Sequence, residues 1–349
     1  MEQHAQQQPD PSKIMQVGTS FMACKTLLAA VKLKLFTLLG GGKKMNSEQI
    51  KNELQLGTTS RHVLDWLDAL TILGYLQREG VLTDAIYTNT IETEIFLDRN
   101  KPSYMGGILE MINSRLYKFW GELEEGLITG LPQNETGGNI VDEGFNKLYE
   151  SPERLQEFID AMSGIQTGNF MMLAKKFDFS KYQTMADIGG ADGWLSIQLC
   201  LNYPSLQCTS FDLPKVEPLA KKKIVQFNLS DRIKVVSGDF FKDELPSADI
   251  ITMGNIIHGM DEDDKQKMIT KVFNTLPSGG ILICIENIID DNRNQNLFGL
   301  LMSLNMLIEN GDAFDYTPSD FKKWTKQAGF ARTEFISLAG PASAAIAYK

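Results

Sequence analysis

The chain has 349 residues, of which 43% are hydrophobic and 22% are charged, with a formal net charge of −10. These values are typical of a globular protein with one large or two ordinary domains. The negative charge argues against nucleic acid or an anionic membrane as the main partner, because both attract basic surfaces. No apolar run comes near the roughly 20 residues that a membrane helix needs, so we expect no membrane segment.

The polar, glutamine-rich start, residues 1–13, is expected to be a disordered tail, because it lacks the apolar stretch of a signal peptide. The four cysteines are scattered without metal-ligand spacing, and each has apolar neighbours: Cys24, Cys200, Cys208 and Cys284. We therefore expect buried free thiols in a cytoplasmic protein, and we predict no metal site.

Residues 14–103 have a helical pattern followed by a short hairpin. The expected elements are helices over 19–39, 46–56 and 60–73 and a two-stranded wing over 75–87. The first helix is apolar enough to be buried, and Asn46 with Gln49 forms a capping box at the start of the second. This succession of three helices and a wing is the order of a winged helix.

Winged helices often bind DNA, so a DNA-binding regulator is the alternative of another class. A recognition helix carries basic residues that meet phosphates and base edges. The candidate helix here carries Arg61 and His62 against Asp65 and Asp68. We therefore favour a dimerisation or packing role for residues 14–103.

The next region, residues 104–178, is again helical and rich in large apolar side chains such as Trp120, Phe158 and Met162. A stripe of this kind is more often plain core than pocket wall. Methionine also suits a pocket for a flat ligand, because its side chain is flexible and polarizable. We interpret this region as a helical connector that also lines a substrate pocket.

From residue 179 to the end, strands and helices alternate. The expected strands lie near 184–188, 207–211, 233–237, 248–253, 280–286, 333–338 and 343–348. Such alternation predicts a mostly parallel sheet covered by helices on both faces, an α/β fold of the Rossmann type.

The first of these strands runs into a glycine-rich turn, residues 189–193, with a helix behind it. Only glycine allows a backbone to turn this tightly and to approach a bound ligand. Asp212 lies 23 residues beyond Gly189, where Rossmann folds place an acid on ribose hydroxyls, and Asp239 follows the next strand. Acids at successive strand ends suit an adenosyl ligand along the sheet edge.

The glycine spacing decides between two ligands. A dinucleotide fingerprint reads Gly-x-Gly-x-x-Gly, whereas this turn reads Gly-Gly-Ala-Asp-Gly followed by tryptophan, and the different spacing disfavours NAD. An extra acid in the turn, Asp192, would repel a pyrophosphate but tolerates a cationic sulfonium. S-adenosylmethionine is therefore the predicted cofactor.

His258 is the candidate base, because it follows a strand at the sheet edge where such folds bind ligands. Glu286 ends the next apolar strand, and a buried carboxylate needs a partner. The imidazole of His258 is a natural one, since a carboxylate orients the ring and stabilises its protonated form. Asp315, in the loop before Pro318, is either a second orienting acid or a solvated loop residue.

These motifs resemble those of the S-adenosylmethionine-dependent O-methyltransferases of plant and microbial secondary metabolism, which include caffeate, acetylserotonin and polyketide O-methyltransferases. The resemblance covers nearly the whole chain and rests on 187–193, 212–214, 238–241, His258 and the closing 328–330. It implies a seven-stranded Rossmann-like methyltransferase sheet with an amino-terminal, all-helical winged-helix dimerisation domain. The substrate would be a hydroxyl of a small aromatic or polyketide-like metabolite.

The resemblance also implies roles for individual residues. Residues holding the cofactor would be Asp187, Gly189, Gly190, Asp212, Leu213, Gly238, Asp239, Phe240, Met253 and Gly254. Residues around the acceptor would be Trp120, Phe158, Met162, Met302 and Met306. Asp212 would bind the ribose, and Asp239 with Phe240 the adenine. His258 would be the general base and Glu286 its first orienting acid, while Asp315 stands where the family usually has the longer glutamate.

Further implications concern assembly and departures from the pattern. The family forms homodimers that swap amino-terminal helices, so residues near Phe21 and Met22 would reach the partner's pocket. Met260 stands where a tryptophan usually packs on adenine, and Gly254 where a lysine usually touches the cofactor. Relatives on this scaffold include enzymes of carbon or nitrogen methylation, decarboxylation, hydroxylation or pericyclic chemistry, so a repurposed enzyme that binds the cofactor without O-methylation is the second reading.

Overall fold

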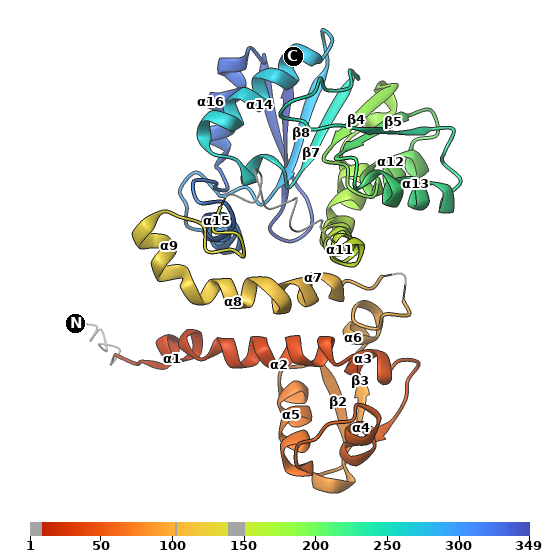
Figure 1. Cartoon of the computed structure of the whole chain (residues 1–349), viewed down its shortest axis with the longest axis vertical. Helices are drawn as coiled ribbons and strands as arrows, with labels where there is room; N and C mark the ends of the chain where they lie inside the picture. Colours follow the sequence, from red (N-terminus) through yellow and green to blue (C-terminus); the bar gives the residue numbers. More distant parts are fainter. Residues whose placement is uncertain (1–8, 102, 139–150) are drawn as a thin grey trace, which may run out of the picture. The chain divides into compact units, whose positions relative to one another are not determined.

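The computed structural model describes residues 9–101, 103–138 and 151–349, and the chain divides into two compact units, Met1–Leu116 and Tyr117–Lys349 (Figure 1). The division falls inside the predicted connector, and the domain boundaries predicted at 103/104 and 178/179 stay predictions. His4 and most of the predicted tail lie outside the described residues. The last two tail residues, Ser12 and Lys13, open the first helix.

The first unit is helical with a small sheet. Its helices are α1 (Ser12–Gly18), α2 (Ser20–Lys32), α3 (Leu35–Leu38), α4 (Ser47–Glu53), α5 (Ser60–Ile72), α6 (Ile91–Phe96) and α7 (Gly106–Met111), followed by a π-helical turn, Ile112–Leu116. Its antiparallel sheet has the order β1 (Met45–Asn46), β3 (Ile86–Asn89), β2 (Leu76–Glu79). The wing and the Asn46–Gln49 capping box are confirmed. Apolar residues of α2 to α5 and of the sheet form the core.

The prediction of one buried helix over 19–39 is wrong in two respects. The helix breaks after Leu33, because Lys34 takes a left-handed conformation with φ of 60°. Only its carboxyl-terminal half is buried, whereas Met22 and Cys24 are exposed in the single chain. An apolar composition did not reveal which face of this helix the unit's own core covers.

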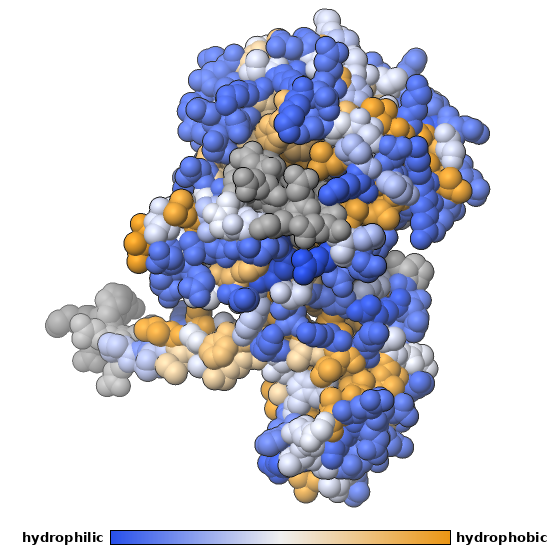
Figure 2. All heavy atoms as spheres, viewed as in Figure 1, coloured by the Kyte–Doolittle hydropathy of each residue, from blue (hydrophilic) through white to orange (hydrophobic). Residues whose placement is uncertain are grey.

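The prediction that no segment is long and apolar enough to cross a membrane is also wrong. The consecutive helices α1 and α2, residues 12–32, pass that test by length and composition, with 17% of the apolar window buried. Exposed apolar side chains such as Ile14, Val17 and Met22 gather on them (Figure 2). In the sequence, single polar residues interrupt the apolar stretch. In the folded chain, its apolar side chains lie near one another on the surface of α1 and α2.

The second unit contains a seven-stranded sheet of order β6-β5-β4-β7-β8-β10-β9. The strands are β4 (Thr184–Ile188), β5 (Gln207–Asp212), β6 (Ile233–Ser237), β7 (Ile250–Gly254), β8 (Ile281–Glu286), β9 (Arg332–Ser337) and β10 (Ser343–Tyr348). The five strands β4, β5, β6, β7 and β8 are parallel, and β10 pairs antiparallel with both β8 and β9. The predicted mostly parallel sheet is confirmed.

Helices cover both faces of this sheet (Figure 1). One face is covered by α11 (Pro152–Lys176) and α12 (Trp194–Asn202), the other by α14 (Glu262–Thr275) and α16 (Pro318–Ala328). The other described helices of this unit are α8 (Tyr117–Phe119), α9 (Leu123–Thr129), α13 (Glu217–Gln226) and α15 (Leu297–Asn310). Short 3₁₀ turns occur at Leu82–Asp84 in the first unit and at Trp120–Glu122, Phe179–Lys181 and Ile257–Gly259 in the second.

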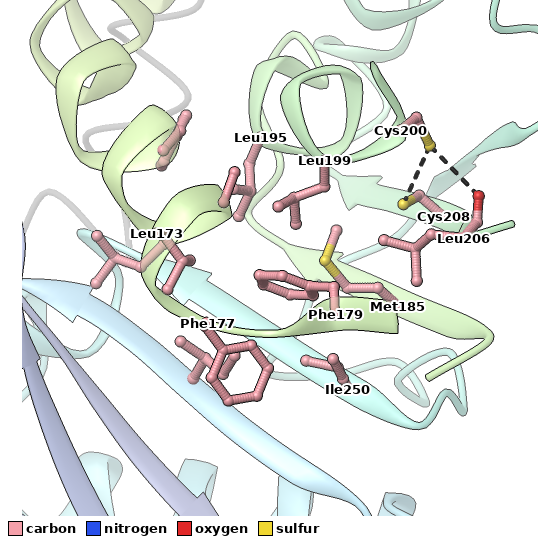
Figure 3. Packing of buried hydrophobic residues seen from close by; sticks show 14 of the residues in the cluster. Leu173, Phe177, Phe179, Met185, Leu195, Leu199, Cys200, Leu206, Cys208 and Ile250 are labelled. Carbon is pink, nitrogen blue, oxygen red and sulfur yellow. Dashed lines mark hydrogen bonds between the residues drawn. The ribbon is translucent and has the colours of Figure 1, made fainter. Parts of the chain in front are cut away.

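Two apolar cores lie on opposite faces of the sheet. In β8, Ile283 belongs to the core under α11 and α12, and its neighbour Cys284 to the core under α14 and α16. Alternate side chains of a strand point to opposite faces, so a strand buried on both sides is apolar throughout. Figure 3 shows the first core, where the Cys200 and Cys208 sulfurs lie 3.5 Å apart as free thiols.

Candidate functional site

The turn after β4 has room only for glycine. Gly189 has φ of 71°, and a Cβ there would lie 2.3 Å from Cδ1 of Ile256. A Cβ on Gly190 would lie 2.4 Å from Oγ of Ser210. The N–H groups of both glycines donate to the carbonyl of Phe211 at the end of β5, at 2.9 and 3.1 Å. The turn is thereby tied to the neighbouring strand at the sheet edge, in a close approach that a side chain at either glycine would prevent.

Two carboxylates flank this turn, of which Asp187 is buried and Asp212 is half-buried. Asp187 on β4 accepts a hydrogen bond from the Thr252 hydroxyl at 2.8 Å, and burial raises its pKa to about 7. Asp212 at the end of β5 accepts from the N–H groups of Ala191 at 2.8 Å and Leu213 at 2.7 Å. Burial nevertheless raises the pKa of Asp212 to about 6. Asp212 is therefore held in place at the strand end where a ribose would lie.

The end of β6 supplies the next acid. A Cβ on Gly238 would lie 2.5 Å from the ring of Phe211, so the chain passes closely over that side chain. Asp239 accepts from the Phe241 N–H at 2.9 Å and from Lys242 at 2.7 Å. Partial burial acts to raise the pKa of Asp239, but these donors outweigh it and lower the pKa. The predicted order of acids along β4, β5 and β6 is present.

Asp192 is paired within the protein, contrary to the prediction that its charge would act on a ligand. We expected its charge to repel a pyrophosphate, but Asp192 is 3% exposed and already has its partners. It accepts hydrogen bonds from Ser163 at 2.8 Å and from the Trp194 N–H at 3.2 Å, and Lys223 pairs with it at 2.5 Å. The Lys223 ammonium compensates its charge, so Asp192 does not discriminate between ligands.

His258 lies in the 3₁₀ turn Ile257–Gly259 that follows β7, and it is 8% exposed. Its Nδ1 atom is 3.4 Å from Oδ1 of Asp315, which comes from the loop before α16 and is 2% exposed. Glu286 ends β8 and accepts the backbone N–H groups of Ile256 and His258, each at 3.1 Å. The structure thus brings all three candidate residues together.

The two acids differ from the arrangement that the sequence suggested. We expected Glu286 to contact the imidazole, with Asp315 undecided between orienting acid and solvated loop. The register pairs Gly254 of β7 with Ile285, so the Glu286 carboxylate lies beneath the backbone of the following turn. The carboxylate beside the ring is that of Asp315, which is buried. Its own N–H is held by Oγ of Ser303 at 3.2 Å.

The pKa of His258 is raised by its neighbours. Burial alone would lower this pKa, but the charges of Asp315 and Glu286 outweigh burial, while Lys265 acts against them. Burial also raises the pKa of Glu286, and Asp315 raises it further. The imidazolium form is therefore favoured here, which suits a group that accepts a proton during a reaction.

The predicted acceptor residues fall into two groups. On α15, Met306 is buried and Met302 half-buried, and Nε1 of Trp120 donates to Oδ1 of Asn305 at 2.9 Å. On α11, Met162 is half-buried. Phe158 packs in a cluster with Ala191, in the turn after β4, and with Leu213, directly after β5.

Two residues that contact or influence the candidate site, Asn305 and Lys265, were not predicted from the sequence. A buried asparagine within the apolar run of α15 was a readable signal. Lys265 lies in a charged stretch, and nothing in the sequence sets it apart from its neighbours.

Both parts of the chain match known protein families. Residues 120–331 match the model of the O-methyltransferase domain, and residues 15–99 match that of the O-methyltransferase dimerisation domain. The chain belongs to the O-methyltransferase family. It is an S-adenosylmethionine-dependent methyltransferase with a dimerisation domain at its amino-terminal end.

Individual relatives are similar to this chain over nearly their whole length. The methyltransferase is 34% identical to the tetracenomycin polyketide synthesis 8-O-methyl transferase TcmO of Streptomyces glaucescens, over 97% of each chain. It is 30% identical to the N,N-dimethyltransferase OxyT of Streptomyces rimosus, over 91% of this chain and 90% of OxyT. The crystal structure of human N-acetylserotonin methyltransferase in complex with S-adenosylmethionine superposes with a TM-score of 0.89, at 26% identity and 99% coverage of both chains.

The residues present fit that cofactor. The carboxylate of Asp212, fixed at the end of β5 by the N–H groups of Ala191 and Leu213, can accept ribose hydroxyls. A Cβ on Gly254 would meet the Phe170 ring at 3.8 Å, an ordinary contact, so a side chain at this position is not excluded by its neighbours. Met260 is 3% exposed and belongs to the core under α14.

Proposed function

We propose that this methyltransferase methylates a hydroxyl of a small aromatic or polyketide-like metabolite, with His258 as the general base. The observation that carries the proposal is the buried His258–Asp315 pair at the carboxyl edge of the sheet, next to the glycine turn after β4. Asp315 would orient the imidazole, and Glu286 would hold the backbone of the His258 turn. Asp315 and Glu286 are thus positioning residues in this proposal.

S-adenosylmethionine, when bound, supplies an electrophilic methyl group on a sulfonium sulfur. The chain's main task is to hold the acceptor oxygen about 3 Å from that carbon, in line with the bond that breaks. With Nδ1 facing Asp315, Nε2 of His258 is the atom that takes the hydroxyl proton as the oxygen–carbon bond forms. A phenol has a pKa of about 10, so its proton leaves together with methyl transfer rather than before it.

The acceptor class is inferred from α15 and from the relatives. The methionines Met302 and Met306 suit a flat aromatic ring, and Asn305 adds an amide beside them. Similarity to TcmO favours a polyketide hydroxyl. Similarity to OxyT favours a second candidate, an amine acceptor, for which positioning would suffice and His258 would matter less.

We also propose that the enzyme works as a homodimer formed through its first unit. The dimerisation-domain match spans residues 15–99, which include the exposed apolar side chains Val17 and Met22. Burial of such a surface against a second copy is favourable by about 25 cal/mol per Å².

The test is turnover of His258→Ala with a panel of polycyclic phenols and matched aryl amines, after S-adenosylhomocysteine binding has been measured by calorimetry. We expect kcat on phenols to fall about 10²–10⁴-fold while the Kd for S-adenosylhomocysteine stays nearly unchanged. His62→Ala is the control, because His62 is exposed in the first unit. Near-wild-type turnover of a phenol by His258→Ala would refute the base assignment, and turnover of amines alone would favour the second candidate.

A further inference from the structure

A lysine is fully buried beside the candidate base. Lys265, in the first turns of α14, has 0% relative exposure. Lysine is among the residues least often buried without a partner, because removing its charge from water is costly. Neither the proton transfer nor the cofactor contacts described above use this group, so its position needs a reason of its own.

The ammonium of Lys265 contacts two different loops. It donates to the backbone carbonyl of Met260, which follows the His258 turn. It also lies 3.7 Å from the ring centroid of Phe314, the residue before Asp315. A cation over an aromatic face is attracted to it, more strongly when both are desolvated. One side chain of α14 therefore joins the segment that carries His258 to the loop that carries Asp315.

The charges around this ammonium are mostly acidic. Glu286 from β8 and Asp315 from its loop act on it most strongly, followed by Asp261 and Glu262 at the start of its own helix, while His258 faces the same two buried acids. Burial lowers the pKa of Lys265 to about 8, and these acids act against that change.

Tyr316 and Cys284 complete the set of titratable groups, since both are buried beside Glu286. Two carboxylates this close to each other repel unless a cation compensates them. Among the described residues, Lys265 is a buried lysine close enough to act on both Glu286 and Asp315, and its ammonium supplies that compensating charge.

We infer that Lys265 is a positioning residue of the methyltransferase site, whose ammonium holds the His258 turn against the Asp315 loop and balances the two acids beside the imidazole. Its effect on turnover rests on the proposed role of His258 as base. Its effect on the protonation of His258 does not, and can be measured without any acceptor.

The experiment follows the ring resonances of the histidines by NMR while the pH is varied. It uses the full-length enzyme with S-adenosylhomocysteine added. The chain has three histidines, so His258→Gln assigns the signal. Lys265→Met removes the charge and the hydrogen bond, whereas Lys265→Gln removes the charge and keeps a donor for the Met260 carbonyl. Lys267→Met is the matched control, because Lys267 lies on the same helix, is exposed and pairs with Asp264.

We expect both Lys265 variants to raise the pKa of His258 by about one unit, because a neighbouring positive charge no longer opposes the imidazolium. The wild-type resonance should also show a second inflection near pH 8, where Lys265 loses its proton, and the variants should lack it. Lys267→Met should shift the His258 pKa by less than about 0.2 units, since solvent screens an exposed charge.

Unchanged His258 titrations in Lys265→Gln and in any folded Lys265→Met would overturn the inference. Equal shifts in the Lys267 variant would do so as well. Turnover of His258→Ala judges the proposed base separately, so failure of one proposal is distinguishable from failure of the other.

Discussion

At the scale of single residues, burial decides what the acids of the site can do. Asp187, Asp212 and Glu286 all stand at or near strand ends, and desolvation raises the pKa of each. The sequence predicted their places, because carboxyl ends of parallel strands share one edge. It did not predict that Asp315 would be the acid beside the imidazole, because that depends on how a distant loop packs.

Replacing Asp315 tests which acid orients the imidazole. Asp315→Asn should lower kcat about 10–100-fold, a part of the 10²–10⁴-fold effect of a general base, and should lower the pKa of His258, because Asp315 raises it. The measurement is a pH–rate profile combined with the histidine titration. Glu286→Gln is the comparison, since its amide oxygen still accepts the backbone N–H groups. A larger fall of the His258 pKa in Glu286→Gln than in Asp315→Asn would contradict our assignment.

The raised pKa of Asp212 predicts a pH dependence of cofactor binding. Ribose hydroxyls donate to the ionised carboxylate, so affinity for S-adenosylhomocysteine should fall as the pH drops through about 6, by about tenfold per unit below it. Stability of the free protein runs the other way. A folded pKa above the unfolded value of about 3.9 contributes stability that is full below that value and lost as the pH rises through about 6.

Calorimetric titrations with S-adenosylhomocysteine at pH values from about 5 to about 8, a range that brackets the raised pKa, check the Asp212 prediction. Asp212→Asn should bind more weakly and lose the slope, whereas Asp239→Asn should bind more weakly with the slope retained, because the pKa of Asp239 is lowered. A slope that survives in Asp212→Asn would assign the pH dependence to another group.

At the scale of elements, the unit formed by β4, its turn and α12 was the most predictable part of the chain. An apolar strand, glycines and a helical run identify it from sequence alone. The glycines are needed for a tertiary reason as well: Gly189 lies against Ile256, in the segment that leads to His258. The glycine turn after β4 and the segment that leads to His258 are therefore in contact.

This contact predicts the effect of a methyl group at position 189. Gly189→Ala should destabilise the protein by about 2–4 kcal/mol, from a left-handed backbone and an overpacked contact. It should also weaken S-adenosylhomocysteine binding at least about tenfold, or about 1.4 kcal/mol. Gly279→Ala is the matched control, with φ of 78° but no atom near the added Cβ, and should cost about 1–2 kcal/mol. Equal unfolding free energies of the two variants would exclude the contact as the cause.

At the scale of the whole molecule, the two units differ in how completely they cover their apolar residues. The second unit buries its sheet on both faces. In the first unit, α1 and α2 expose Ile14, Val17 and Met22 in the single chain. Contiguous exposed apolar surface of this kind marks an interaction site, and the dimerisation-domain match accounts for it.

Charges on that surface should dissociate the proposed dimer. Val17→Glu combined with Met22→Glu should give a folded monomer at micromolar concentration, because a buried unpaired carboxylate is strongly unfavourable at an apolar interface. Light scattering after size-exclusion chromatography measures the mass, and circular dichroism confirms folding. Val225→Glu, at an exposed apolar position of α13, should leave the dimer intact. A monomeric wild-type protein would refute the dimer itself.

Periodicity, glycine turns and acids at strand ends are local signals, so the fold class, the strand positions and the edge of the sheet that gathers the candidate residues could be predicted from the sequence. Tertiary structure alone decided the break at Lys34, the pairing of Asp192 with Lys223, the place of Asp315 at the imidazole and the burial of Lys265. Each of these depends on residues distant in the chain, or on which face of a helix the core covers, and no local pattern encodes such contacts.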